Sequence, residues 1–239
     1  MTDMQTTIIT DFQKVCEFNK CFDFPQFDDL TNNKCLQLRL DLIEEELKEL
    51  QEAYNNQDII EEQDACADIL YVAYGMAYTY KIDSDEYMKN YYFLKNNEST
   101  LFKKLNYDLY LDYNLDRSIY LNKLFDDFNT IKEFANYLDK KLTMDILHQL
   151  IYHVYEFQYI SKYDSDRIFT IVHDSNMSKL CKNENEAIDS VNKYIEDYKN
   201  GNSPYDSPYY YKLDNDLYVI KNKSSGKALK SINYTKVQL

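Results

Sequence analysis

The chain has 239 residues, of which 44% are apolar, and a formal net charge of −14 at pH 7. This length suffices for a buried core, and only three Gly and three Pro favour a mainly helical fold over a turn-rich β fold. The acidic balance argues against a nucleic acid duplex as a partner, because phosphate binding relies on clustered Lys and Arg.

Three amphipathic helices are predicted in the N-terminal half. The first spans about residues 6–21, and Pro25 with the polar run after it ends that segment. The second spans about 34–55, with Leu and Ile recurring every three or four residues, and the third spans about 59–80. The third is more apolar than the second, which indicates deeper burial.

The C-terminal segment has a different pattern. Between residues 205 and 234, apolar and polar residues alternate around a Ser-Ser-Gly turn, which predicts a small β-hairpin. The expected fold class is therefore all-α, a helical bundle with a small C-terminal tail that resembles a β-hairpin.

The middle of the chain repeats its beginning. A shift of 81 positions superimposes residues 39–85 on residues 120–166 without a gap, and the clearest match is between KIDSDEYMK and KYDSDRIFT. We infer an internal duplication of a helical hairpin within one domain of residues 1–239. The first repeat covers about 30–90, a degenerate second repeat about 110–170, and the tail about 171–239.

Cysteine spacing and hydropathy indicate the compartment. The five Cys residues form no Cys-x-x-Cys pair and no Cys/His ligand spacing, which is typical of reduced thiols in an intracellular protein. No segment approaches the ~18 apolar residues of a membrane span, and the N-terminus does not read as a signal peptide. We expect a soluble, cytoplasmic protein with no membrane partner.

Six carboxylates of the first repeat recur at one-turn spacing. They are Glu45, Glu46 and Glu49 on the second predicted helix and Glu61, Asp64 and Asp68 on the third. If these helices pack antiparallel, the two acidic stripes face each other, and divalent ions would relieve the repulsion. Oxygen ligands without His or Cys favour Mg²⁺, with Mn²⁺ as the alternative. A solvated charged face is the other interpretation of this spacing.

The second repeat keeps little of this acidity. Its residues at the positions of Glu45, Glu46, Glu49, Glu61 and Asp68 are, in order, Asp126, Asp127, Thr130, Leu142 and Gln149. We therefore expect one acidic site in the chain.

Three runs of the sequence resemble a known family. They are LRLDLIEEELKELQEA, DACADILYVAYG and VHDSNMSKL. The resemblance is to the MazG-like all-α nucleoside triphosphate pyrophosphohydrolases, which include dUTPase-like and phosphoribosyl-ATP pyrophosphohydrolase-like members. Their Glu-Glu-x-x-Glu and Glu-x-x-Asp motifs bind Mg²⁺ that bridges to a nucleotide. The first motif falls on Glu45, Glu46 and Glu49, and the Asp of the second falls on Asp68.

The sequence differs from the family motifs at one position, and two further residues match the family. Ala65 stands where the family has the Glu of its second motif, and Asp64 is the candidate replacement as a metal ligand. By the same resemblance, Asn176 and Lys179 correspond to an Asn-and-Lys signature near the phosphates, where an amide and an ammonium group can donate to phosphoryl oxygens. They are the candidate substrate-binding residues.

The resemblance implies Mg²⁺-dependent hydrolysis of a nucleoside triphosphate, such as dUTP or another deoxynucleotide, to a monophosphate and pyrophosphate. Glu46 and Glu49 are the candidate catalytic residues, with Glu46 expected to orient or deprotonate the attacking water. Such enzymes bury their helical pairs against a second subunit, so residues 110–166 are expected to act as a built-in partner. The chain would then be pseudo-dimeric, and further homo-oligomers stay open.

Three alternatives belong to other classes. A catalytically silent nucleotide sensor would use the same residues without turnover. A purely structural helical protein would tolerate loss of the carboxylates. A di-iron carboxylate bundle needs two Glu-x-x-His pairs, whereas the chain offers only Asp145-x-x-His148.

Overall fold

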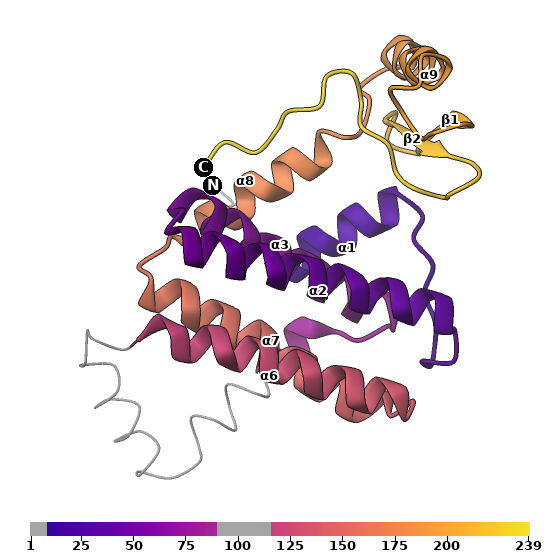
Figure 1. Cartoon of the computed structure of the whole chain (residues 1–239). Helices are drawn as coiled ribbons and strands as arrows, with labels where there is room; N and C mark the ends of the chain where they lie inside the picture. The colour runs from indigo at the N-terminus through magenta and orange to yellow at the C-terminus, as the bar shows by residue number, and fades with distance from the viewer. Residues whose placement is uncertain (1–8, 90–115) are drawn as a thin grey trace, which may run out of the picture. The chain divides into compact units, whose positions relative to one another are not determined.

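The structure, a computed structural model, describes residues 9–89 and 116–239 (Figure 1). The elements in chain order are α1 (Asp11–Cys21), α2 (Asn33–Asn56), α3 (Ile59–Thr79), α6 (Arg117–Asn136), α7 (Lys140–Ile160), α8 (Ser165–Met177), α9 (Glu184–Lys199), β1 (Pro208–Lys212) and β2 (Tyr218–Asn222). The prediction of a mainly helical chain with a small C-terminal hairpin is confirmed. Within these two stretches, every helix is too short or too polar to traverse a lipid bilayer.

The contacts within the chain form two compact units. The first contains the described residues of 1–16 and 25–169 together with residue 239, and the second contains 17–24 and 170–238. The expectation of a single domain stays a prediction.

The first helix begins later than the sequence pattern suggests. Thr10 accepts a hydrogen bond from the Gln13 N–H at its hydroxyl (3.2 Å), and its own N–H donates to Gln13 Oε1 (3.1 Å). This reciprocal capping box starts α1 at Asp11. Residues 9 and 10 are not helical, so the prediction of a helix from residue 6 is wrong for these two residues. Residues 6–8 lie outside the described part of the chain.

α2 and α3 form a tight hairpin whose bounds match the predicted ones within one residue. Gln57 closes α2 with a left-handed φ of 56°, and the Asp58 carboxylate accepts a hydrogen bond from the Glu61 N–H to open α3. The buried stripe of α2 consists of Leu36, Leu40, Ile43, Leu47, Leu50 and Ala53. α3 has 14 buried residues and α2 has six, which confirms the deeper burial expected for α3.

α6 and α7 form a second hairpin, and the two hairpins face each other. α3 packs against α7 while α2 packs against α6, so each helix meets one helix of the other hairpin (Figure 1). The hydroxyl oxygens of Tyr74 and Tyr155 lie 3.1 Å apart, and these two positions are equivalent under the 81-residue shift. Contact between equivalent residues is the relation that a local two-fold axis produces.

Local geometry repeats at the same interval. α3 and α7 start and end 81 positions apart, and Asp58 and Asp139 cap them with the same side-chain bond. The left-handed residue before each cap also recurs, as Gln57 with φ 56° and Leu138 with φ 57°. A Leu is strained in this conformation, so a shared backbone explains it better than its own preference. These facts support the duplication, which stays our proposal, and its inner bounds near residues 90 and 110 lie outside the described residues.

The second unit contains the small sheet. β1 pairs antiparallel with β2, from Pro208 opposite Asn222 to Lys212 opposite Tyr218, so residues 213–217 connect the strands. The predicted Ser-Ser-Gly turn is wrong as that connection. It reverses the chain after β2 instead, where Gly226 has a φ of 70° and its N–H donates to the Asn222 carbonyl at 2.8 Å. The core of this unit consists of Cys181, Ala187, Ile220 and Leu229.

Candidate functional site

The acidic residues of the first repeat lie on the two helices of the first hairpin. Glu46, Asp64 and Asp68 are half-buried, whereas Glu45, Glu49 and Glu61 are exposed. α2 supplies the first motif from its middle turns, and α3 supplies its carboxylates from its first three turns. Because α2 packs against α3, the half-buried carboxylates lie at the edge of the contact between the helices.

The carboxyl of Glu46 is strongly perturbed. Burial raises the pKa of its carboxyl to about 8, and further contributions come, in decreasing order, from the negative charges of Asp68, Glu49, Glu45 and Asp64. The interaction between two charges weakens with distance. The structure therefore brings carboxylates of both helices together around Glu46.

Glu49 forms the outer part of the same group. Burial raises the pKa of its carboxyl, and the charges of Glu45, Asp64, Glu61 and Glu52 raise it further, in that order. Glu52 lies one helical turn beyond Glu49 and was not among the residues that the sequence singled out. The acidic group thus continues along α2 toward its C-terminal end.

The departure from the family motif has a structural counterpart. Ala65 is only 4% exposed, so its side chain belongs to the core rather than to the acidic surface. Asp64 raises the pKa of both Glu46 and Glu49, which shows that its charge faces α2. Asp64 therefore stays the candidate for the missing carboxylate.

The donor chemistry fits a hard divalent cation. Every candidate ligand is a carboxylate, the type that Mg²⁺ prefers, and a cation would offset the burial and the repulsion that together raise the pKa of the Glu46 carboxyl. As the side chains lie, no group of three or more Asp, Glu, His or Cys in the described stretches is placed to hold a metal ion directly. A metal at this site is therefore a proposal.

The predicted phosphate-binding residues lie in the second unit. Asn176 is in the last turn of α8, and Lys179 follows the end of that helix. The Lys179 ammonium donates to Asn176 Oδ1 at 2.5 Å and lies 5.5 Å from the centre of the Phe18 ring. The two residues thus form a pair, and their part in nucleotide binding stays a prediction.

The second hairpin has a different arrangement at the equivalent place. Asp127 stands at the position of Glu46 and is 5% exposed, with its two oxygens engaged by neighbours on α7. Gln149 Nε2 donates to Asp127 Oδ1 at 2.6 Å, and His153 Nδ1 lies 2.6 Å from Oδ2. Gln149 stands at the position of Asp68. A neutral amide has therefore replaced one of the opposing carboxylates, and protein hydrogen bonds satisfy the other.

One buried acid was missed by the sequence analysis. Glu62 is fully buried, and Arg117 binds it with two nitrogens, at 2.7 Å to Oε2 and 3.3 Å to Oε1. The Tyr163 hydroxyl donates to Oε2 at 2.6 Å. The guanidinium lies over the rings of Tyr54 and Phe157, 5.1 and 5.6 Å from their centres. This cluster joins α3 to the second hairpin, and no local sequence signal indicates it.

A family model and a known protein match this chain. The family model described as phosphoribosyl-ATP pyrophosphohydrolase (PRA-PH) matches residues 15–91, which include α2 and α3. The chain is also 36% identical over 241 residues to an uncharacterized protein of Acanthamoeba polyphaga mimivirus, and the alignment covers 93% of this chain and 91% of that protein. No solved structure matches the chain.

Proposed function

Because the chain belongs to the phosphoribosyl-ATP pyrophosphohydrolase family of MazG-like all-α enzymes, we propose that it hydrolyses a nucleoside triphosphate with Mg²⁺. The products are a nucleoside monophosphate and pyrophosphate, and the expected substrate is dUTP or another deoxynucleoside triphosphate. The observation that carries the proposal is the half-buried carboxyl of Glu46, surrounded by carboxylates of α2 and α3. Such a group fits a substrate that arrives with its own cations.

The acidic residues divide the chemistry between them. Glu45, Glu46, Glu49 and Asp68, with Asp64 beside them, would hold Mg²⁺, which neutralises the triphosphate and lowers the pKa of a bound water. The attacking water forms a new P–O bond while the bridging bond between the α- and β-phosphates breaks, and the electron pair leaves with pyrophosphate. Glu46, ionised once a cation offsets the burial and repulsion around it, would accept the proton of the water, with Glu49 one turn along α2 as the alternative base.

Two further proposals rest on the family resemblance. Asn176 and Lys179 would donate to phosphate oxygens as charge shifts toward the leaving pyrophosphate. The second hairpin would take the place of the second subunit that related enzymes use. In support, the hairpins pack face to face through α3 with α7 and α2 with α6.

Pyrophosphate release from a nucleotide panel tests the hydrolysis directly. The panel contains the deoxy- and ribonucleoside triphosphates, dUTP and phosphoribosyl-ATP, each with and without Mg²⁺. We expect release only with the metal, and Glu46→Gln should lower kcat about 100-fold or more because it removes the base. Glu133→Gln, which changes an exposed carboxylate of α6, is the matched control and should keep full activity. Absence of release from every nucleotide, with Mg²⁺ or Mn²⁺, would contradict the proposal.

A catalytically silent nucleotide sensor is the second candidate, because Ala65 replaces a carboxylate of the family motif and lies in the core. Isothermal titration with Mg²⁺ and a nonhydrolysable dUTP analogue separates the candidates. A sensor binds the analogue but releases no pyrophosphate from dUTP. A structural helical protein binds neither ligand and tolerates Ala at Glu45, Glu46 and Asp68.

A further inference from the structure

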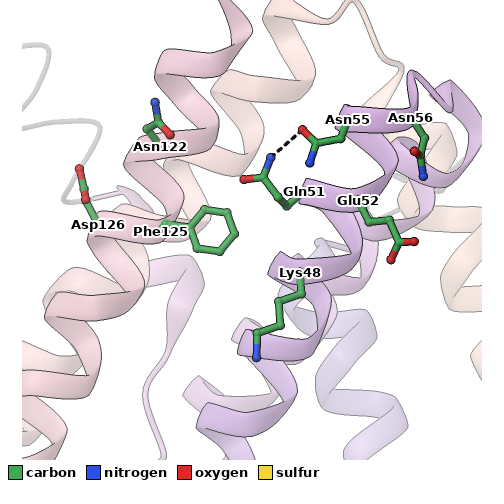
Figure 2. A pocket seen from close by; sticks show the side chains of 8 residues that line it. All are labelled: Lys48, Gln51, Glu52, Asn55, Asn56, Asn122, Phe125 and Asp126. Carbon is green, nitrogen blue, oxygen red and sulfur yellow. Dashed lines mark hydrogen bonds between the residues drawn. The ribbon is translucent and has the colours of Figure 1, made fainter.

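A groove of about 790 Å³ lies between α2 and α6 (Figure 2). Its volume is within the range of small-molecule sites. Four carboxamide side chains from the two helices line it, together with one aromatic ring. They are Gln51, Asn55 and Asn56 of α2 and Asn122 and Phe125 of α6.

These side chains suit an uncharged, planar, polar ligand. Each carboxamide can both donate and accept hydrogen bonds, and Gln51 already donates to Asn55 Oδ1 at 3.2 Å. Figure 2 shows the half-buried Phe125 ring projecting from α6 toward Gln51 on α2. An aromatic face beside hydrogen-bonding amides is the combination that proteins use to bind nucleobases.

The groove lies at one end of the contact between α2 and α6, and the positions 81 residues away from its lining residues lie at the other end. The positions equivalent to Gln51 and Phe125 are Lys132 and Glu44, and these two close the other end with an ion pair of 3.3 Å. The Lys132 ammonium also lies 4.6 Å from the centre of the Phe128 ring. At the groove, an amide and a phenyl ring therefore stand where the other end has two opposite charges.

The groove begins one helical turn from the acidic group. Glu52 lines the groove and lies three residues from Glu49 on α2, close enough for its charge to act on that carboxyl. Glu52 and Asp126 also give the groove negative charge, and Lys48, its one lysine, pairs with Glu44 at 3.4 Å. Phosphates are therefore disfavoured in the groove, whereas an uncharged base is not.

We propose that the groove between α2 and α6 binds the base and sugar of the nucleotide whose phosphates lie at the acidic residues. This inference rests on the proposed function and adds the residues that determine base preference. Phe125 stacks on the base, and the carboxamides of Gln51, Asn55 and Asn122 meet its polar edge.

The test uses the intact chain and ligands that carry only one half of a nucleotide. Unphosphorylated deoxynucleosides are titrated while the side-chain amide signals of Gln51, Asn55 and Asn122 are followed by NMR. We expect at least one nucleoside to shift these signals, whereas inorganic tripolyphosphate leaves them unchanged. Phe125→Leu should abolish the nucleoside shifts.

Turnover provides a second readout of the same groove. Phe125→Leu should raise KM for the preferred nucleotide about tenfold, the usual size of a lost base-stacking contact, with kcat nearly unchanged. Asn122→Ala changes an exposed side chain, so it tests the groove even if Phe125→Leu does not fold, and it should alter the preference among bases. Asn129→Ala, an exposed amide on the same helix outside the groove, is the matched control and should change neither readout.

The outcomes separate this inference from the proposed function. In one outcome pyrophosphate is released, but nucleosides leave the amide signals of the groove unchanged and Asn122→Ala leaves the base preference unchanged. That outcome would contradict base binding in the groove and would still agree with hydrolysis. Nucleoside shifts at the groove without pyrophosphate release from any nucleotide would support base binding and contradict hydrolysis.

Discussion

At the scale of single residues, ionisation of the Glu46 carboxyl lowers the stability of the folded chain. Its carboxyl is half-buried beside other carboxylates, so the folded state favours the protonated form. The unfolded chain, by contrast, ionises near the ordinary value of 4.5. Without a cation, folding at neutral and alkaline pH must therefore oppose the ionisation of this group.

Glu46→Gln is expected to stabilise the chain in metal-free buffer at high pH. Because the folded pKa of about 8 exceeds the ordinary 4.5, the stability linked to Glu46 is present below pH 4.5 and lost as the pH rises through 8. The substitution should raise the free energy of unfolding by about 2 kcal/mol at pH 9, with allowance for solvent screening. At pH 4 it should change little. Urea unfolding with EDTA at both pH values measures the difference.

Glu133→Gln provides the comparison for removal of an exposed carboxylate. It should shift the free energy of unfolding by less than about 0.5 kcal/mol at either pH. Equal stabilisation by Glu46→Gln at pH 4 and pH 9 would show that ionisation of this carboxyl is not the cause.

The spacing of residues predicts some of these contacts and not others. Carboxylates three or four positions apart share a helix face, so the grouping around Glu46 could be predicted from the sequence. The ion pair of Glu62 with Arg117 could not, because 55 positions separate the partners. The sequence pattern placed Ala65 in the motif but could not show that its side chain belongs to the core.

At the scale of the elements, α7 has the same length and the same type of N-cap as α3 but carries different polar side chains. The helix bounds and the Asp caps recur after 81 positions. Gln149 and His153 of α7, however, bind the carboxylate of Asp127, whereas α3 has an acid, Asp68, at the position of Gln149. Under the proposed function only the first hairpin holds a cation, so the second can replace like charges with hydrogen bonds. In the first hairpin the charge of Asp68 instead raises the pKa of the Glu46 carboxyl.

Gln149→Asp is expected to reverse this exchange. The new carboxylate would face Asp127, which is 5% exposed, and would remove the bond of 2.6 Å that now holds its Oδ1. The free energy of unfolding should fall by about 2 kcal/mol at pH 7, because two adjacent carboxylates, of which Asp127 is buried, cannot both ionise without repulsion. Urea unfolding followed by circular dichroism measures the loss.

Gln149→Asn separates charge from shape. It shortens the side chain as Asp does but keeps an amide, so any loss beyond that of Asn reports the charge. The loss with Asp should also shrink at pH 4, where carboxylates become protonated. Equal losses for the two variants at both pH values would contradict the role assigned to Gln149.

The bounds of α2 and α3 could be predicted well because local caps set them. The start of α1 depends on a capping box between Thr10 and Gln13, which outweighs the apolar residues before it. The C-terminal hairpin was harder, since residues 213–217 and 224–226 both suit a turn. In the sheet, which packs against α9, the strand register makes residues 213–217 the connection.

At the scale of the whole molecule, the two hairpins supply each other with a hydrophobic partner. Equivalent tyrosines meet at their contact, and the Glu62–Arg117 pair joins α3 to α6 at the edge of this contact. Neither hairpin alone would cover its apolar faces. The fusion of both in one chain makes this contact independent of protein concentration, unlike that of a dimer.

Loss of Arg117 is expected to weaken the joint between the hairpins. Arg117→Ala leaves the carboxylate of Glu62, fully buried, without its cation, which should lower the free energy of unfolding by about 3–5 kcal/mol. Arg167→Ala, at an exposed arginine of α8, is the control and should cost less than about 0.5 kcal/mol. In the double variant Glu62→Leu with Arg117→Met, no charge is left buried, and most of the loss should be recovered. If the double variant is as unstable as the sum of its single substitutions, the two side chains act independently and the joint lies elsewhere.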